Sequence, residues 1–436
     1  MDKNILNQLK TGICFLEVEI RNPVDIQNSG SFIGSGFVIT HPESQKKLIV
    51  TCAHVAPNST RTINIEFSNG FRTKGKVVYT DHAHDFSFIE YEDDKNLQSG
   101  VPYEFEKVVS QFDTLTLIGG NEGYKSYVAS GIVADPHILI DERNTVGIQS
   151  SIPTAGGTSG SPVFNEDGKI VGMHIAGTER CSFELAIEII LDALDRFIHE
   201  IPKLESGITF EYENKYKFIS AGLITDEDET NYFSHSSKLL VIKDVDVLYE
   251  AFNLLMPGDV VLSINQEPVL NAFYAERFMN DSRNRNCDFT VKRNGKVIEV
   301  KFKLKVATQE KTNRILLWEN CTFQDSNILT RRYYSIKEEG VLLSKCVSGS
   351  PFFMVGGESK KVNGGKGTLI THFNGIRVKN LDQFIKVLSE NRPAAVSFHY
   401  YDYITVVPMK FIICDVSYDQ VSEVVFLEKE IFEQAA

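Results

Sequence analysis

The sequence has no long apolar run, and its first residues do not form a recognisable leader. No stretch approaches the ~18 continuous apolar residues that a membrane-spanning helix requires. Residues 1–20 lack the basic start, apolar core and small-residue cleavage site of a secretory signal peptide. We therefore expect an intracellular protein without a membrane span. The nucleus or the cytoplasm is favoured, and an organelle stays open.

Excess positive charge and metal-type cysteine spacing are absent as well. With 45 basic and 58 acidic residues, the formal net charge is −13, which disfavours nucleic acid as a partner because phosphates attract clusters of Lys and Arg. The cysteines are odd in number, at positions 14, 52, 181, 287, 321, 346 and 414, and none of them forms a C-x-x-C pair. We expect reduced and mostly buried thiols, and no metal site.

The chain is long enough for two or three domains, because 436 residues exceed one ordinary core. Up to about residue 180, short β-rich runs follow one another with turns between them, which is typical of an all-β barrel or sandwich. Residues 184–201 then have apolar side chains every three or four positions, which predicts an amphipathic helix closing the domain. Beyond residue 205, two segments repeat a plan of strands, one helix and a closing hairpin.

One stretch, GGTSGSPVFNEDGKIVGMH at residues 156–174, carries the main functional signal. Glycine and serine usually mark a loop, but here the order G-x-S-G-x-P runs directly into a hairpin. A serine becomes a nucleophile when a His takes its proton and a carboxylate orients that His. His54 follows the strand LIVTC, and Asp85 opens the strand FSFIEY. The order His54, Asp85, Ser159 is that of chymotrypsin-like double β-barrel proteases and predicts a catalytic triad.

Each of these residues also has an ordinary structural explanation. His54 alone fits a histidine at a strand end, Asp85 a strand-start cap, and Ser159 a loop serine. The HAHD stretch at residues 82–85 has the form of a weak metal pair, but no further ligand cluster supports it. Cys52 fits a core residue better than a nucleophile. The triad is favoured because chain order, strand context and the G-x-S-G-x-P motif all agree.

The glycines beside the serine predict an oxyanion hole. In the chymotrypsin-like fold, the backbone N–H groups next to the nucleophile stabilise the negative charge of the transition state. In this chain they are the N–H groups of Gly157 and Ser159. Gly157 permits the backbone conformation that directs its N–H toward that charge.

We expect two segments beside Ser159 to line S1, the pocket that binds the residue before the cut bond. These residues are Ile152, Pro153, Thr154, Ala155, Met173, His174, Ile175 and Ala176. None is acidic, so Lys and Arg are disfavoured and a small or medium apolar residue is expected before the cut. Specificity should be loose, because one methylene changes discrimination by only ~1–3 kcal/mol.

At this point the chain resembles the HtrA/Deg serine proteases. The resemblance rests on GSGFVIT, TCAHV, DHAHDFSF, YVASGIVADP and the Ser159 stretch, and on LLMPGDVVLSINQEPV, which is similar to an HtrA PDZ domain with Gln266 where glycine is usual. The family often has Asn and Gly where this chain has Thr158 and Ser161. The whole chain most resembles the first half of the large HtrA-like nuclear proteases of fungi and plants.

The resemblance implies a mainly β architecture, with a chymotrypsin-like double β-barrel followed by two PDZ-like α+β domains. We expect the protease domain at residues 1–202, the first PDZ-like domain at 203–308 and the second at 309–420. The resemblance also implies cleavage of unfolded or misfolded proteins and peptides, capture of C-terminal peptides by PDZ domains, a possible homotrimer, and no metal or organic cofactor.

A second hypothesis is a catalytically silent, PDZ-containing chaperone or scaffold that binds peptides. The three triad residues argue against it, because a scaffold has no need of all three. Whether the second PDZ-like unit binds peptide or is only structural is left open by the sequence.

Overall fold

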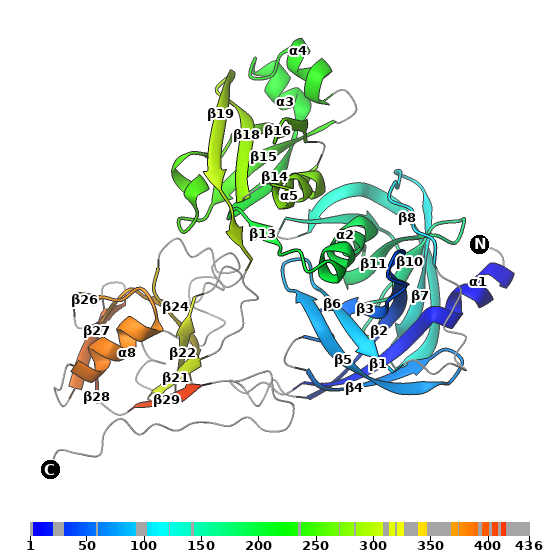
Figure 1. Cartoon of the computed structure of the whole chain (residues 1–436), viewed down its shortest axis with the longest axis horizontal. Helices are drawn as coiled ribbons and strands as arrows, with labels where there is room; N and C mark the ends of the chain where they lie inside the picture. The colour runs from blue at the N-terminus through cyan, green and yellow to red at the C-terminus, as the bar shows by residue number, and fades with distance from the viewer. Residues whose placement is uncertain are drawn as a thin grey trace. The chain divides into compact units, whose positions relative to one another are not determined.

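The chain forms two compact units, which are drawn in Figure 1. One unit contains residues 1–21 and 29–307, and the other contains residues 22–28 and 308–436. The computed structural model describes residues 3–20, 30–57, 60–92, 103–121, 123–140, 144–233, 237–269, 271–282, 285–307, 314–318, 321–326, 339–346, 368–373, 375–390, 395–400, 403–408 and 411–415. Among these residues, no helix has the length and apolar character needed to cross a membrane.

The first six strands of the larger unit close into an antiparallel barrel in the order β1-β2-β3-β6-β5-β4, coloured blue in Figure 1. A short helix, α1 (Lys3–Leu9), precedes them. Strand β3 is buried on both faces, and Phe37, Phe86 and Phe88 fill the core. The strands are β1 (Ile13–Ile20), β2 (Gly30–Thr40), β3 (Lys47–Cys52), β4 (Thr60–Phe67), β5 (Arg72–Asp81) and β6 (Phe86–Tyr91).

The next six strands close a second barrel in the order β10-β11-β12-β9-β8-β7. They are β7 (Thr114–Asn121), β8 (Tyr124–Ile140), β9 (Thr145–Ser150), β10 (Pro162–Phe164), β11 (Ile170–Gly177) and β12 (Ser182–Ala186). The helix expected at residues 184–201 is present as α2 (Ile187–Ile198). Its predicted start was wrong, because the residues before Ile187 pair with β9 and β11 as strand β12.

Residues 204–306 add a twisted sheet with helices to the same unit. Its strand order is β14-β15-β16-β18-β19, with β17 paired to β16, and β13 pairs separately with β20. The predicted helix after residue 271 is α5, which begins after the Asn271 side chain accepts a hydrogen bond from the Tyr274 N–H. The elements are β13 (Leu204–Glu205), β14 (Ile208–Asn214), α3 (Lys215–Ser220), α4 (Asp226–Asp228), β15 (Lys238–Val245), β16 (Val260–Ile264), β17 (Glu267–Pro268), α5 (Ala272–Asn280), β18 (Asn286–Arg293), β19 (Lys296–Lys303) and β20 (Lys305–Val306).

Gln266, which stands where the resembling PDZ domains usually have glycine, lies in a turn. Its φ is 71° and that of Asn265 is 52°, so both residues of this β16–β17 turn adopt the left-handed conformation. A residue with a side chain pays roughly 1–2 kcal/mol for that conformation. The Asn265 side chain offsets part of the cost by donating to the Phe278 carbonyl and accepting from the Asp288 N–H.

The smaller unit also follows the predicted plan of strands, one helix and a hairpin. Its sheet has the order β24-β23-β22-β21-β29, and its core gathers around Trp318 and Phe384. The predicted final hairpin is formed by β27 and β28. The elements are β21 (Arg314–Trp318), β22 (Cys321–Asp325), β23 (Val341–Cys346), β24 (Thr368–Ile370), β25 (His372–Phe373), β26 (Ile376–Arg377), α8 (Leu381–Glu390), β27 (Ala395–Tyr400), β28 (Tyr403–Pro408) and β29 (Phe411–Asp415). The mainly β prediction is therefore confirmed.

Candidate active site

Strand pairing in the first barrel brings His54 to Asp85. Strands β3 and β6 are antiparallel with Cys52 opposite Phe86, so the residues just after β3 lie beside those just before β6. His54 Nδ1 lies 2.6 Å from Asp85 Oδ2, and the His54 N–H donates to Asp85 Oδ1 over 2.9 Å. The His54 side chain is 48% exposed, so its other ring nitrogen is accessible to a substrate. This pair has the geometry of a base held by a carboxylate.

The turn that carries Asp85 is held in an uncommon conformation. Asp85 has a φ of 58°, a left-handed value that Asp and Asn tolerate better than most residues. Its carbonyl accepts a hydrogen bond from the Ala53 N–H, and Thr145 donates to the neighbouring Ala83 carbonyl. Both barrels therefore fix this turn, since Ala53 follows β3 and Thr145 begins β9.

Ser159 lies at the seam between the two barrels. The Ser35 N–H on β2 donates to the Ser159 carbonyl over 2.9 Å. At Gly34, a Cβ atom would meet the Val55 side chain at 2.6 Å and the Ser159 carbonyl at 3.3 Å, so only glycine allows this approach. The seam therefore brings Ser159 against the residue that follows His54. No hydrogen bond joins Ser159 Oγ to His54 among the described residues, and such bonds often form only around bound substrate.

Ser35 also supports the turn that holds the expected oxyanion donors. Its hydroxyl donates to the Gly157 carbonyl over 2.9 Å and accepts from the Gly120 N–H over 2.8 Å. Ser35 is fully buried, and Gly157 has a φ of 96°. The sequence analysis did not single out Ser35, although the residue lies inside the quoted GSGFVIT segment. Its function depends on contacts with residues 85 and 122 positions away, which no local pattern reveals.

Cys52 and His174 pack behind the pair as uncharged groups. Burial, followed by the nearby charge of Asp85, raises the pKa of the Cys52 thiol well above its usual value. The thiol donates to the His174 carbonyl over 3.3 Å. Burial, together with the charge of His54, lowers the pKa of His174 to about 4. Cys52 therefore remains a protonated core residue, as the sequence favoured.

The residues expected to form S1 differ in burial: some are buried, some are exposed, and Thr154 is half-buried. Ile152, Met173 and Ile175 are buried and pack in the barrel cores. Pro153, Ala155 and Ala176 are exposed, while His174 is buried and Thr154 is half-buried. Thr154 Oγ1 would lie 2.4 Å from a Cβ at Gly177. This contact joins the segment before Ser159 to the end of β11, the two segments that the sequence analysis selected.

A buried acid that the sequence analysis missed lies beside this region. Glu184 on β12 pairs in register with His174, and its Oε1 lies 4.0 Å from His174 Nδ1. Burial raises the pKa of Glu184 to about 7, although Ser182 and Ser150 donate to the carboxylate. His174 Nδ1 and Glu184 Oε2 have no hydrogen-bond partner among the described residues. Only the strand register reveals this neighbour, because Glu184 lies eight positions after Ala176, the last wall residue considered.

Among the residues that the structure describes, two groups of side chains have spacing that suits a metal ion. The first, Cys52 with His54 and Asp85, contains the candidate base and a protonated thiol. The second is His41, Asp195 and His199. The Ser44 N–H donates to His41 Nδ1, so the proton of the neutral ring lies on Nε2, 3.4 Å from Asp195 Oδ1. A ring nitrogen that carries a proton does not bind a metal, so this donor set fits hydrogen bonding better.

A group of four charged side chains, with Asp81 and His84 buried and Lys203 and Glu276 partly buried, includes residues directly before Asp85. We call Asp81, His84, Lys203 and Glu276 the ion cluster. His84 Nδ1 lies 3.1 Å from Asp81 Oδ2 and its Nε2 lies 3.2 Å from Glu276 Oε2, while Lys203 Nζ lies 2.9 Å from Asp81 Oδ2. The cluster therefore ties α5 and residue 203 to the turn that ends in Asp85.

The charges in the ion cluster balance as two positive and two negative groups. Burial and Lys203 lower the pKa of His84, but the carboxylates of Glu276 and Asp81 outweigh them and raise it to about 9. For Glu276, burial acts upward, while His84 and Lys203 bring the pKa down to about 2. From the sequence, the HAHD stretch was interpreted only as a weak metal pair, because Lys203 and Glu276 lie more than 100 positions away from it.

The first comparison, with models of protein families, shows which class of protein this part of the chain resembles. Residues 34–173 match the family described as a trypsin-like peptidase domain. This range includes His54, Asp85 and Ser159, the three residues of the predicted triad.

The similarity to individual proteins is more specific. The chain is 24% identical over 373 residues to the pro-apoptotic serine protease NMA111 of Lodderomyces elongisporus, covering 82% of this chain and 37% of that protein. The NMA111 of Debaryomyces hansenii is also 24% identical, over 84% of this chain and 38% of its own length. The chain therefore spans less than half the length of these relatives.

Solved structures resemble the chain in fold. The HtrA-type protease AlgW with a tripeptide matches 70% of this chain and 97% of its own, with a TM-score of 0.53 and 18% identity. AlgW with a decapeptide gives a TM-score of 0.50 over 70% of this chain and 99% of its own. The chain is thus similar in sequence to NMA111 serine proteases and in fold to HtrA-type proteases, as the predicted resemblance implies.

Proposed function

We propose that this chain is an HtrA-type serine endopeptidase that cleaves unfolded or damaged polypeptides. The observation that carries the proposal is the 2.6 Å contact between His54 Nδ1 and Asp85 Oδ2, beside a seam that fixes Ser159 to β2. Because the curated relatives are much longer than this chain, their activity does not transfer directly, and we propose the activity for this chain itself. A location in the nucleus or cytoplasm and a homotrimeric assembly also remain proposals.

In the proposed reaction, the hydroxyl of Ser159 attacks the carbonyl carbon of the substrate and His54 Nε2 takes its proton. The N–H groups of Gly157 and Ser159 stabilise the resulting oxyanion. Collapse of this intermediate breaks the C–N bond, and the leaving amine takes the proton from His54. Water, activated by the same imidazole, then hydrolyses the acyl ester and restores Ser159. Asp85 orients the ring and stabilises its positive charge throughout.

The segments 203–308 and 309–420 are proposed as PDZ-like domains that bind C-terminal peptides by strand addition. Support comes from the sheets at both places and from the AlgW structures with peptides. Part of one sheet edge is occupied in the first segment, because the Asn144 amide bonds to the Ile208 carbonyl and the Phe210 N–H on β14. A peptide adding to β14 has to bind beyond Phe210 or displace Asn144.

The proposed S1 pocket is expected to accept a small or medium apolar residue before the cut bond. Purified chain incubated with β-casein should yield fragments, and mass spectrometry of their new C-termini should show mainly Ala, Val, Ile, Leu or Thr. The physical reason is the apolar and small side chains of the wall and a Glu184 whose raised pKa reduces its negative charge near pH 7.

Cleavage sites would be mapped at pH 6 and pH 8, because Glu184, with a pKa of about 7, carries less negative charge at the lower pH. A predominance of Lys or Arg before the cut at both pH values would contradict the proposed pocket. Absence of fragments, also after addition of C-terminal peptides, would favour the second hypothesis, a catalytically silent scaffold that binds peptides.

A further inference from the structure

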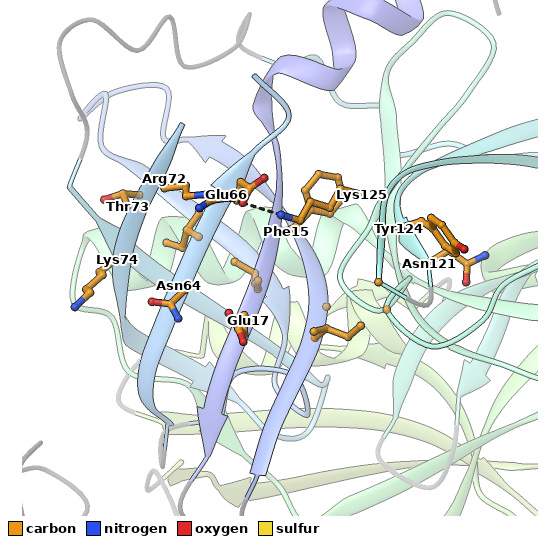
Figure 2. A pocket seen from close by; sticks show the side chains of 17 residues that line it. Phe15, Glu17, Asn64, Glu66, Arg72, Thr73, Lys74, Asn121, Tyr124 and Lys125 are labelled. Atoms are coloured by element: carbon orange, nitrogen blue, oxygen red, sulfur yellow. Dashed lines mark hydrogen bonds and ion pairs between the residues drawn. The ribbon is translucent and has the colours of Figure 1, made fainter. Parts of the chain in front are cut away.

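The larger unit contains a cleft of about 630 Å³ that the proposed mechanism does not use. We call it the β1–β5 cleft. Figure 2 shows its labelled side chains, with those of β4 and β5 on one side and Asn121 and Tyr124 of the β7–β8 hairpin on the other. The volume is within the range of sites that bind ligands or peptide side chains. Six strands, β1, β2, β4, β5, β7 and β8, contribute to this space, so no local sequence motif reveals it.

The β1–β5 cleft begins at the candidate catalytic residues. Gly34 and Gly157 both line it. Gly34 approaches the Ser159 carbonyl and Val55, the residue after His54. Gly157 carries an expected oxyanion donor. A polypeptide bound across Ser159 would therefore have one side of its cut bond at the entrance of this cleft.

The two halves of a bound polypeptide extend from Ser159 in opposite directions. The half of the substrate that becomes the acyl group directs its side chain toward the proposed S1 wall in the second barrel. The other half leaves as the amine and has to extend away from that wall. The β1–β5 cleft lies along strands of the first barrel and reaches Gly34 and Gly157 beside Ser159, so it offers a path to this half of the substrate.

The strand register aligns apolar, acidic, amide and basic side chains in a row across the cleft. Across the barrel face, Ile33 on β2 is opposite Glu17 on β1, Glu17 is opposite Asn64 on β4, and Asn64 is opposite Lys74 on β5. Ile33 is half exposed and lies next to Gly34, so the end near Ser159 is apolar. Phe15 adds to this end, because it would lie 3.2 Å from a Cβ at Gly120.

On balance, the cleft is basic. Its charged lining consists of Arg72, Lys74 and Lys125 against Glu17 and Glu66, which leaves one positive charge in a chain whose net charge is −13. Lys125 and Arg72 each lie 2.7 Å from Glu66 Oε2, and they lower the pKa of that carboxyl. Glu66 is thus neutralised by its partners, and Lys74 adds a further positive charge on β5.

We propose that the β1–β5 cleft binds the leaving half of the substrate polypeptide, with an apolar residue directly after the cut bond and an acidic residue about four positions further along. The spacing follows from geometry, since three strand separations span about 14 Å and an extended peptide advances about 3.3 Å per residue. This inference rests on the proposed function and names the substrate class for that same site.

Two substrate types separate this inference from the proposed function. The first is a peptide ending in an aminocoumarin, which has no residues after the cut bond. The second is an internally quenched peptide with the same acyl half, followed by Leu or Gly at the first position and Asp or Lys at the fifth. The peptide with Leu and Asp is expected to show a kcat/KM about tenfold above that with Gly and Lys.

Charge reversal in the cleft tests the position of the acidic residue. Lys74→Glu is expected to lower kcat/KM for the Asp peptide about fivefold, the scale of an exposed charge pair, and to leave the aminocoumarin peptide unchanged. Lys76→Glu is the matched control, because Lys76 is an exposed lysine on the same strand outside the cleft. Equal effects of the two variants, or no dependence on residues after the cut, would overturn the inference.

If neither substrate is cleaved, the proposed function fails, and binding decides on the cleft by itself. Fluorescence anisotropy of the labelled quenched peptides with Ser159→Ala would then be measured. Tighter binding of the Asp peptide than of the Lys peptide, lost in Lys74→Glu, supports the cleft as a binding site, whereas equal binding overturns it.

Discussion

Ser159→Ala is expected to abolish cleavage of casein, with turnover reduced about a million-fold as in serine proteases that lose the nucleophile. The reason is that Ser159 is the hydroxyl we expect to be activated by His54, the imidazole that Asp85 holds. Fragment formation followed by gel electrophoresis and mass spectrometry measures the effect. Ser31→Ala, at an exposed serine on β2, is the control and should cleave at the parental rate.

Peptide binding distinguishes lost chemistry from lost folding in the same experiment. Ser159→Ala removes one oxygen atom and should keep the circular dichroism spectrum and the peptide affinity of the parent. Cleavage by Ser159→Ala at the parental rate would contradict the assignment of the nucleophile. Loss of both binding and cleavage would show a folding defect and require Ser159→Cys as a second variant.

Lys203→Met is expected to destabilise the larger unit by about 3–5 kcal/mol. Removing one partner from a buried ion pair leaves an uncompensated charge, and the lost attraction is large in a medium of low polarity. In this chain the substitution would leave Asp81 and Glu276 with only His84 between them. Urea unfolding followed by far-ultraviolet circular dichroism provides the measurement.

Two features of the chain serve as controls for the ion-cluster experiment. Lys301→Met breaks an exposed pair with Asp288, and the expected cost is small because water and salt screen such a pair. The single tryptophan, Trp318, belongs to the smaller unit, so its fluorescence transition should be the same in both variants. Equal stabilities of Lys203→Met and Lys301→Met would contradict a buried ion cluster.

The ion cluster also predicts how stability depends on pH. Because the pKa of His84 is raised from 6.5 to about 9, its stabilising contribution is complete below about pH 6.5 and is lost as pH rises through 9. We expect the free energy of unfolding to fall by about 2 kcal/mol between pH 7 and pH 9. Glu276, with a pKa lowered to about 2, acts in the opposite direction and loses its contribution as pH falls below about 4.5.

Urea unfolding at pH 7, 8 and 9 tests this dependence, with His84→Gln as the matched variant. The variant has no imidazole to titrate and should show a much flatter profile over this range. A parental stability that is constant from pH 7 to pH 9 would contradict a charged His84 in the ion cluster.

The sequence predicted the two chemical centres of the site because both coincide with strand ends. LIVTC and FSFIEY are apolar β runs, and the antiparallel pairing of β3 and β6 brings the residues at their ends together. The chain order of His54, Asp85 and Ser159 then carried the functional hypothesis. Mainly β structure and the helix after the second barrel followed from periodicity alone.

Features that depend on distant contacts were not predicted. Glu184 reaches His174 through the register of β12, and Lys203 reaches Asp81 across 122 positions. The helix expected from residue 184 begins three residues later, because strand pairing with β9 and β11 determines the structure of the first residues. Such contacts are set by tertiary packing, which local periodicity does not encode.

Active-site labelling tests the central claim most directly. The chain would be treated with a fluorophosphonate, a reagent that reacts with an activated serine hydroxyl, and its intact mass and modified peptide would be determined. Our account predicts one adduct, located on Ser159 and absent from Ser159→Ala. An adduct on another residue, or no adduct on a folded chain that binds peptide, would contradict it.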